Sequence, residues 1–313
     1  MIQFTLNRLI WLIPTILAMS VIVFVVSHET PGSPLDPAAA GHNSLSDAEM
    51  ANVRAHYGLD KPLWVQYRTY IWNALHLDFG NSFIYKTRSV KDILGETFPA
   101  SLQLGTMALV LALVFGTILG IFAAINQNGF LDYTSIGLAV IGTSIPNFVI
   151  AIFFVFIFAL ELRWVPPIGW DMHDPKTLVL PVVADALGPL AVLARYTRSS
   201  MVDVIRSDFV RTARAKGLTE TRIVVTHVLK NALIPVITLV GPLFAALATG
   251  SFVIEQIFAI PGMGKFFVTS MQGRDYPMIM AVILLYGVFL AIMNLVVDLM
   301  YGVLDPRIRL GGQ

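Results

Sequence analysis

The chain has no cysteine among its 313 residues, and only 13% of its residues are charged. The absence of cysteine excludes disulfides, thiolate metal sites and thiol nucleophiles, and it leaves the redox compartment undefined. Soluble domains carry roughly 25% charged residues. The low charge, together with 56% hydrophobic residues, therefore places the chain among integral membrane proteins. The net charge of +1 says little by itself, so the positions of the charges carry the information.

Motifs of catalytic and metal sites are also missing. The sequence contains neither a His-Glu-x-x-His helix nor a Gly-x-Ser-x-Gly turn, and its six histidines match no metal-ligand spacing. The nearest counterpart of a phosphate-binding loop is Pro261-Gly-Met-Gly-Lys265. It has Ala259 where the first glycine belongs and Phe266 where Ser or Thr belongs. We therefore predict no enzyme active site, no metal site and no cofactor in this chain.

Six apolar stretches are long enough to cross about 30 Å of hydrocarbon as helices. They cover residues 9–27, 98–125, 133–160, 178–197, 234–258 and 278–303. The fourth is interrupted by Pro181, Asp185, Gly188 and Pro189, and we expect a kinked span inside a bundle. The predicted fold class is all-α integral membrane, with six transmembrane helices.

The first apolar stretch could instead belong to a cleaved signal peptide. Its apolar run is longer than a typical signal core, and Val26-Ser27-His28-Glu29 offers no small-x-small cleavage pattern. We therefore expect it to remain as a membrane span.

Lysine and arginine in short loops predict the orientation, because loops longer than about 60 residues cross the membrane largely regardless of charge. When residues 28–97 are set aside for that reason, most lysine and arginine residues lie on the same side as the termini. Counting that loop would remove the bias. We predict both termini in the cytoplasm and an outer cap over 28–96, within an N-terminal region 1–96. Residues 97–303 then form a five-helix transmembrane domain, and 304–313 form a cytoplasmic tail.

This topology can be tested with single cysteines, because the chain has none of its own. Ser46 lies in the predicted outer cap and Ser207 in a predicted cytoplasmic loop. A membrane-impermeant thiol reagent should label Ser46→Cys from outside and Ser207→Cys only from the cytoplasmic side. Labelling of both from one side would exclude the six-span topology.

The segment 198–233 is a basic loop between two spans. Ser207 is expected to cap a helix that begins at Asp208, where a negative charge suits the helix dipole. Gly217 is expected to end this helix in the left-handed conformation, and Thr219 can open the next one. The sequence thus predicts two short helices joined by a glycine.

Three interpretations of this loop compete. Its positive charge could bind anionic lipid headgroups, but lipid binding would not require two short helices joined by a glycine. A DNA-binding helix-turn-helix is disfavoured by the membrane spans on both sides. The third is docking on a cytosolic protein, where Phe209 and the small Ala213 enter a groove and the arginines meet a polar rim.

Several motifs carry a resemblance to a known family. Arg211-Thr-Ala-Arg-Ala-Lys-Gly217 and His227-Val-Leu-Lys-Asn-Ala-Leu-Ile-Pro235 resemble the EAA loop of binding-protein-dependent ABC permeases, in the branch for dipeptides, oligopeptides and nickel. Further matches to the first permease subunit of that branch are Arg8 with Pro14, Tyr57-Gly-Leu-Asp-Lys-Pro62, Leu77-Asp-Phe-Gly-Asn-Ser82, Val253-Ile-Glu-Gln-Ile-Phe-Ala-Ile-Pro-Gly-Met-Gly264, Arg274-Asp-Tyr-Pro277 and Asp305-Pro-Arg-Ile-Arg309. Each motif is weak, but in order they cover essentially the whole chain.

The chain also departs from the family pattern. Arg211 and Lys230 stand where the general EAA pattern has glutamate and proline, as in a variant of this branch. Ser33 stands where an early Pro-Gly-Asp has its acid, so no role is transferred to that position.

The resemblance implies a type I ABC importer transmembrane domain in the inner membrane of a prokaryote, translocating peptides. The implied partners are a second permease, one or two cytosolic ATPases that bind ATP and Mg, an extracytoplasmic solute-binding protein, and membrane lipid. No nucleic acid is implied. The implied coupling residues are Ser207, Asp208, Phe209, Arg211, Thr212, Ala213, Arg214, Ala215, Lys216, Gly217 and Leu218. The turn Pro261, Gly262, Met263 and Gly264 would help to receive the binding protein.

Other substrates and other functions stay open at this point. Nickel, glutathione and oligosaccharides are alternative solutes within the branch. A transporter or channel working alone and an assembly scaffold are alternative functions.

Acids and glycines within the spans are the remaining candidates. Asp185, Glu255 and Asp298 are acids in or near spans, where ionisable residues are expensive and commonly functional. Asp185 is the candidate for lining a polar path, and the other two are expected to anchor helices. Gly116-x-x-x-Gly120 permits close approach of another helix.

Overall fold

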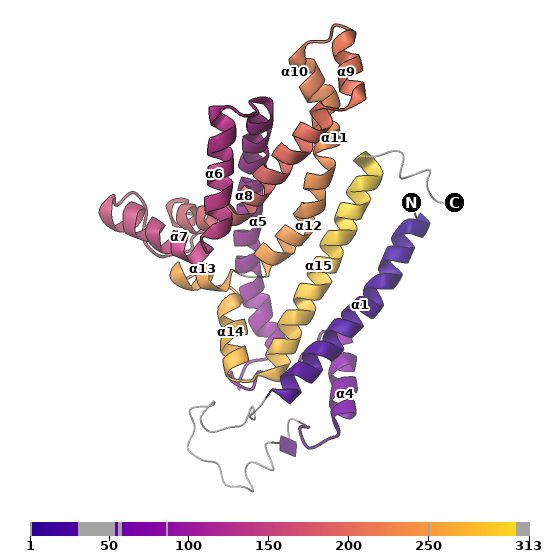
Figure 1. Cartoon of the computed structure of the whole chain (residues 1–313). Coiled ribbons are helices and arrows are strands. Elements are labelled where there is room, and N and C mark those ends of the chain that lie inside the picture. The colour runs from indigo at the N-terminus through magenta and orange to yellow at the C-terminus, as the bar shows by residue number, and fades with distance from the viewer. Residues whose placement is uncertain (1, 31–53, 56–57, 86, 250, 305–313) are drawn as a thin grey trace. The chain divides into compact units, whose positions relative to one another are not determined.

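In the computed structural model the described part of the chain is mostly helical (Figure 1). The structure describes residues 2–30, 54–55, 58–85, 87–249 and 251–304. Within these ranges the only β pairing is an isolated bridge between Asn81 and Ser89. The chain forms two compact units, unit 1 from Ala100–Pro261 and Ile292–Gln313, and unit 2 from Ile2–Pro99 and Gly262–Ala291.

The described helices support the membrane class. Four are long and apolar enough to span a bilayer: most of α1 (Ile2–Glu29), α5 (Val90–Ile125), α8 (Lys176–Ile205) and most of α15 (Tyr276–Leu304). Two bent helix pairs raise the number to six if each pair is one span. The six predicted spans agree with this larger number.

The third predicted span, 133–160, was expected as one continuous helix, and it is broken. It consists of α6 (Phe130–Ser144), α7 (Asn147–Phe154) and the π-helical η1 (Val155–Glu161), with a bend of 103° between α6 and the rest. The break falls at Ile145, which is extended at φ −96 and ψ 126. Pro146 causes this, because proline lacks the N–H that would continue the ladder and excludes its predecessor from helical backbone.

The fourth and fifth spans also differ from their predicted limits. α8 continues through Ile205, well past the expected end at 197, and contains Pro181 and Pro189 without ending at either. The fifth span, expected at 234–258, ends earlier as α12 (Ile234–Ala248), and a separate short α13 (Phe252–Ile257) follows. On its N-terminal side lie α10 (Glu220–Arg222), η2 (Ile223–Val228) and α11 (Leu229–Ala232), bent by 48° from α12. Part of the predicted loop is therefore helical and leads directly into α12.

Within unit 1, α5 lies close against α8 at two glycines. A Cβ on Gly116 would stand 2.8 Å from the carbonyl oxygen of Leu190, and one on Gly120 would stand 2.5 Å from the Cβ of Thr197. The predicted role of these two glycines in close helix approach is confirmed. The adjoining core includes the fully buried Ala108, Ala112 and Leu193.

Unit 2 contains α1, α4 (Leu63–Leu75), the first turns of α5, α14 (Gly264–Gln272) and the first half of α15. Its buried Asp275 accepts a hydrogen bond from the Ser82 hydroxyl and a weaker one, at 3.3 Å, from the backbone N–H of Met278. Burial raises the pKa of Asp275, and these hydrogen bonds partly oppose the shift. Burial, and then the nearby charge of Asp275, also raises the pKa of Tyr70.

The predicted outer cap is only partly described. Its residues 31–53, with Ser33 and Ser46, lie outside the described residues. The described portion includes α4, and α5 begins at Val90, within the predicted cap.

Candidate functional site

The helix predicted at Asp208 is present as α9 (Asp208–Ala215). Ser207 occupies the N-cap position with extended backbone, as expected, but its side chain makes no cap hydrogen bond. Its hydroxyl instead donates to the carbonyl oxygen of Val204 at 2.6 Å. The prediction that the Ser207 side chain caps α9 was therefore wrong, although Ser207 does occupy the N-cap position.

Gly217 ends this helix in the left-handed region, at φ +76, which confirms the prediction. The Gly217 N–H donates to the carbonyl of Arg214 at 2.9 Å, and the Leu218 N–H donates to that of Ala213 at 3.3 Å. These two bonds define a Schellman motif, which satisfies carbonyls that have no partner within the helix. A Cβ at Gly217 would meet no atom within 4 Å, so backbone conformation alone favours glycine here.

α9 presents different faces to the protein and to its surroundings. Val210 is fully buried and Ala213 nearly so, and both belong to a core cluster with Met201, Ile223 and Val228. Phe209 is not part of that core cluster and remains 46% exposed. Ala213 was expected beside Phe209 on the docking surface, and this was wrong, because Ala213 is part of the core. The inward anchor Val210 was missed, although it lies three residues before Ala213, a spacing that marks one helix face.

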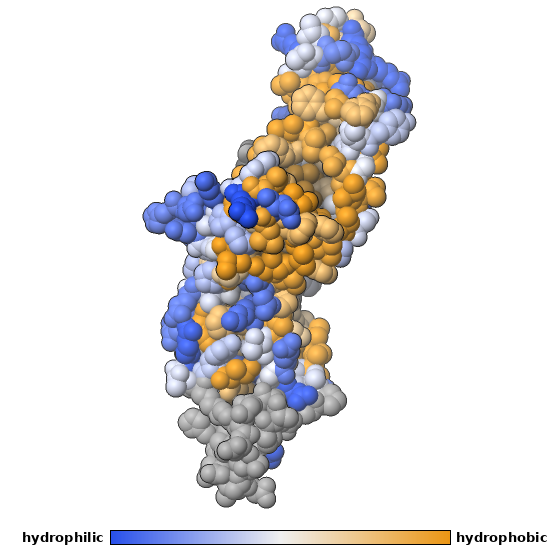
Figure 2. Space-filling view, turned by 90° about the vertical axis from the view of Figure 1, so that its left-hand side faces the viewer, coloured by the Kyte–Doolittle hydropathy of each residue, from blue (hydrophilic) through white to orange (hydrophobic). Residues whose placement is uncertain are grey.

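The charged side chains of α9 do not form a purely cationic rim, because two of its arginines are paired with acids. Arg211 lies 3.2 Å from Asp208, and Arg214 donates to Glu220 through two nitrogens at 2.6 and 3.1 Å. The carboxylate of Glu220 raises the pKa of Arg214 further above its usual range. The remaining predicted coupling residues Thr212, Ala215 and Lys216 are exposed, and Leu218 is partly buried. Hydrophilic residues gather at this tip of unit 1, next to a largely hydrophobic surface (Figure 2).

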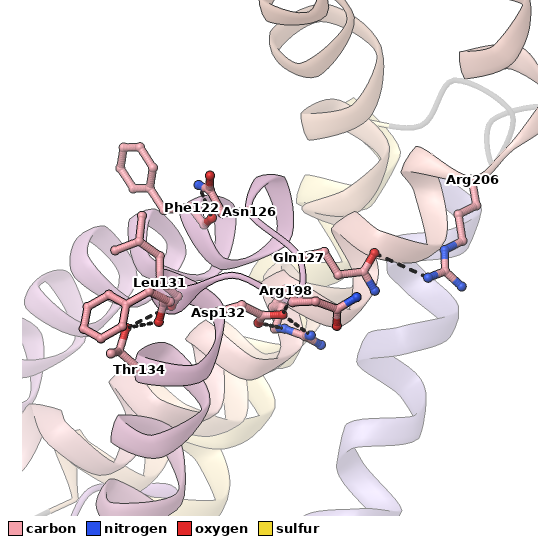
Figure 3. A network of polar contacts seen from close by, with 10 residues as sticks. Phe122, Asn126, Gln127, Leu131, Asp132, Thr134, Arg198 and Arg206 are labelled. Carbon is pink, nitrogen blue, oxygen red and sulfur yellow. Dashed lines mark hydrogen bonds and ion pairs between the residues drawn. The ribbon is translucent and has the colours of Figure 1, made fainter.

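An ion pair fixes the turn between α5 and α6 to α8, a short distance before α9 (Figure 3). Asp132 on α6 is buried and accepts two hydrogen bonds from Arg198 on α8, one of them at 2.7 Å. Asp132 also accepts the backbone N–H of Asn128 at 2.8 Å, and Gln127 accepts a longer bond from Arg206 at 3.4 Å. This ion pair was not predicted from the sequence, although an acid at the start of α6 and a basic segment at the end of α8 are the signal that could have indicated it.

We expect Asp132→Asn to destabilise unit 1, because the amide keeps the shape but leaves the half-buried Arg198 guanidinium without its counter-charge. A hydrogen bond to a charged group contributes about 1.5 to 3 kcal/mol. The change should appear as a lower midpoint of thermal unfolding in detergent. Asp203→Asn removes the same charge from an exposed position of α8 and should leave the midpoint unchanged. Equal midpoints for the two variants would show that the ion pair does not stabilise the unit.

The candidate acids lie in different settings. Asp185 is fully buried, and its Oδ1 accepts a hydrogen bond from Ser251 while Oδ2 has no partner among the described residues. Glu255 is also buried and accepts a hydrogen bond from Ser101 at 2.6 Å, which joins α13 to α5. Asp298 lies in α15, and its side chain falls outside the described part of the structure. The roles proposed for these acids stay predictions.

The glycine-rich turn lies where the chain passes from unit 1 to unit 2. Pro261 is exposed, whereas Gly262, Met263 and Gly264 are buried. Met263 packs in the core of unit 2 with Val90 and Met278, and Gly264 begins α14. A docking role for this turn also stays a prediction.

Several apolar spans and an amphipathic helix at a hydrophilic tip define a multi-span helical membrane protein, and comparison of folds agrees. The chain is similar to a chain of the MetNI methionine ABC transporter in inward-facing conformations, with a TM-score of 0.57 and 17% identity. The match covers 68% of this chain and 96% of that one. At this identity the similarity concerns the fold alone.

Sequence comparisons identify the family. Residues 116–310 match the model described as "Binding-protein-dependent transport system inner membrane component", and residues 1–105 match that of its N-terminal region. The chain belongs to this family of transport permease components and is a multi-span protein of the inner membrane. It is 47% identical to the dipeptide transport system permease protein DppB of Bacillus subtilis, over 99% of both chains. It is 43% identical to the oligopeptide transport system permease protein OppB of Escherichia coli K12, over 99% of this chain and 100% of that one.

Proposed function

We propose that this chain is one permease subunit of an importer that carries di- or oligopeptides into the cell, driven by ATP hydrolysis in separate subunits. Relatives named for dipeptide and oligopeptide transport, which match it over nearly its whole length, support the peptide assignment. Nickel, glutathione and oligosaccharides are the alternative solutes.

The exposed Phe209 on α9 is the observation that carries the coupling part of the proposal. An aromatic side chain exposed at a hydrophilic surface is typical of an interface anchor, which stabilises binding once it is fully desolvated in a pocket. Val210 and the Schellman motif at Gly217 fix the helix to the core behind it. A movement of the ATPase that holds Phe209 would therefore be transmitted to α8 and to the segments leading into α12.

The proposal assigns the other parts of the reaction to partners. ATP and Mg would bind to one or two cytosolic ATPase subunits, and this chain itself would hold no cofactor. A second, similar permease would complete the path across the membrane. An extracytoplasmic binding protein would deliver the peptide, with Pro261–Gly264 as the proposed docking turn.

The division of labour predicts two activities that can be measured separately. The chain purified alone should hydrolyse ATP no faster than background, and the complex purified from native membranes should hydrolyse it. Cells that contain the complex should accumulate a radiolabelled dipeptide, and cells lacking this chain should not. Hydrolysis by the chain alone that survives further purification would contradict the assignment of ATP to partners. Uptake of nickel but not of dipeptide would contradict the assigned solute.

A further inference from the structure

Unit 2 contains an apolar groove of about 430 Å³ along its membrane-spanning helices. Its walls come from α1, α4, the first turns of α5 and the first half of α15, and they include Leu17, Leu94, Phe98 and Leu285. The groove opens to the surface, since Leu17 is 44% exposed and Val288 is 38% exposed.

The groove offers almost nothing to a polar ligand. Ser20 and Lys91 are the polar side chains on its lining. The Ser20 hydroxyl is already occupied, because it donates to the carbonyl oxygen of Leu17 at 2.7 Å and lies 2.8 Å from the hydroxyl of Tyr67. Lys91 is exposed and forms no ion pair with any residue that the structure describes. A ligand that fits must therefore be apolar along most of its length and anionic at one end.

The order of residues along α5 gives the direction of such a ligand. Lys91 lies in the first turn, Gly95 one turn further, and Phe98 about 10 Å from Lys91 at 1.5 Å per residue. α4 lines the groove as well, and none of its residues is buried. Its Trp72 and Leu75 are exposed. Exposed tryptophan and lysine are typical of the membrane interface, where lysine extends toward the phosphate layer. The groove then runs from the phosphate layer toward the bilayer centre.

We propose that this groove binds one acyl chain of a membrane phospholipid, whose phosphate group lies against Lys91. A helix of another subunit suits the groove less well. Helix contacts inside membranes use small residues that let backbones approach, whereas this lining is mainly leucine, isoleucine and phenylalanine. The proposal requires only that the chain spans the membrane, so it does not depend on the transported solute.

Gly95→Leu tests the proposal, because it fills the groove without disturbing the fold. A Cβ at Gly95 would meet no atom within 4 Å, and leucine favours a helix more than glycine does. Gly137 on α6 is equally open and does not line the groove, so Gly137→Leu is the matched control. Lys91→Glu, which repels the phosphate, is a second variant that leaves the groove unfilled.

The assay uses the chain with its copurifying subunits, in vesicles of phosphatidylethanolamine and phosphatidylglycerol. A small fraction of the phosphatidylglycerol carries a photoactivatable diazirine in one acyl chain, and labelled peptides are located by mass spectrometry. We expect labels concentrated on the groove segments of α1, α5 and α15. Gly95→Leu should reduce them about tenfold, because it displaces several methylenes of the chain. Lys91→Glu should reduce them several-fold, and Gly137→Leu should not change them.

Two outcomes would overturn the proposal. Labels spread evenly over all apolar helices, or unchanged in both Gly95→Leu and Lys91→Glu, would mean adventitious lipid contact only. A photoreactive amino acid at Val288 that captures another subunit instead of lipid would mean that a protein covers the groove.

Discussion

Gly217→Val is expected to reduce uptake to background while the chain still inserts into the membrane and pairs with the second permease proposed above. Gly217 has φ +76, and a residue with a Cβ costs about 1 to 2 kcal/mol in that region. Such a cost is too small to unfold the core beneath α9. It is large enough to break the Schellman bonds of Gly217 and Leu218 and to turn α9 away from α10. Phe209 would then no longer enter the proposed groove of the ATPase subunit. The amount of copurified ATPase should therefore fall together with uptake.

Gly217→Asn is the matched control for this prediction. Asparagine adopts the left-handed conformation far more readily than valine does, and neither variant changes the charge of the loop. The Cβ meets no atom within 4 Å in either case, so contact of the Cβ itself cannot account for a difference between them. We expect Gly217→Asn to retain most uptake and ATPase association. Normal values of both for Gly217→Val would show that this loop does not couple the subunits.

Gly120→Leu is expected to prevent stable folding of unit 1. A Cβ on Gly120 already stands 2.5 Å from the Cβ of Thr197 and 2.6 Å from the carbonyl oxygen of Ala194. A leucine side chain there must push α5 and α8 apart, and overpacking of this kind costs at least about 1 to 3 kcal/mol. The cost should be higher at this position, because one of the opposing atoms is backbone. Expression in membranes and monodispersity on size exclusion are the measurements.

The control is Gly137→Leu, which makes the same substitution in α6 where a Cβ meets no atom within 4 Å. Both variants gain helix propensity, by up to about 1 kcal/mol relative to glycine. Propensity alone would therefore predict that both are stabilised. Equal recovery of the two proteins would contradict a close contact between α5 and α8 at this glycine.

The structure also explains where the sequence analysis succeeded and where it was limited. Hydropathy located the apolar stretches because each span is a local property of the chain. The break at Ile145 was missed because Pro146 stands within a long apolar run, and prolines are often tolerated in such runs. Pro181 and Pro189 are tolerated in this way within α8. A proline therefore does not by itself reveal whether its helix will bend.

The sequence alone determined the membrane class, the family motifs, the start of α9 and the left-handed Gly217, because each depends on neighbouring residues. Only the tertiary structure decided which side chains face one another. It placed Ala213 and Val210 in the core, left Phe209 exposed, and brought Asp132 to Arg198. It also paired Glu255 with Ser101 and formed the open groove beside Lys91. Such contacts join residues far apart in the chain, and they depend on how helices pack, which hydropathy and local propensity do not specify.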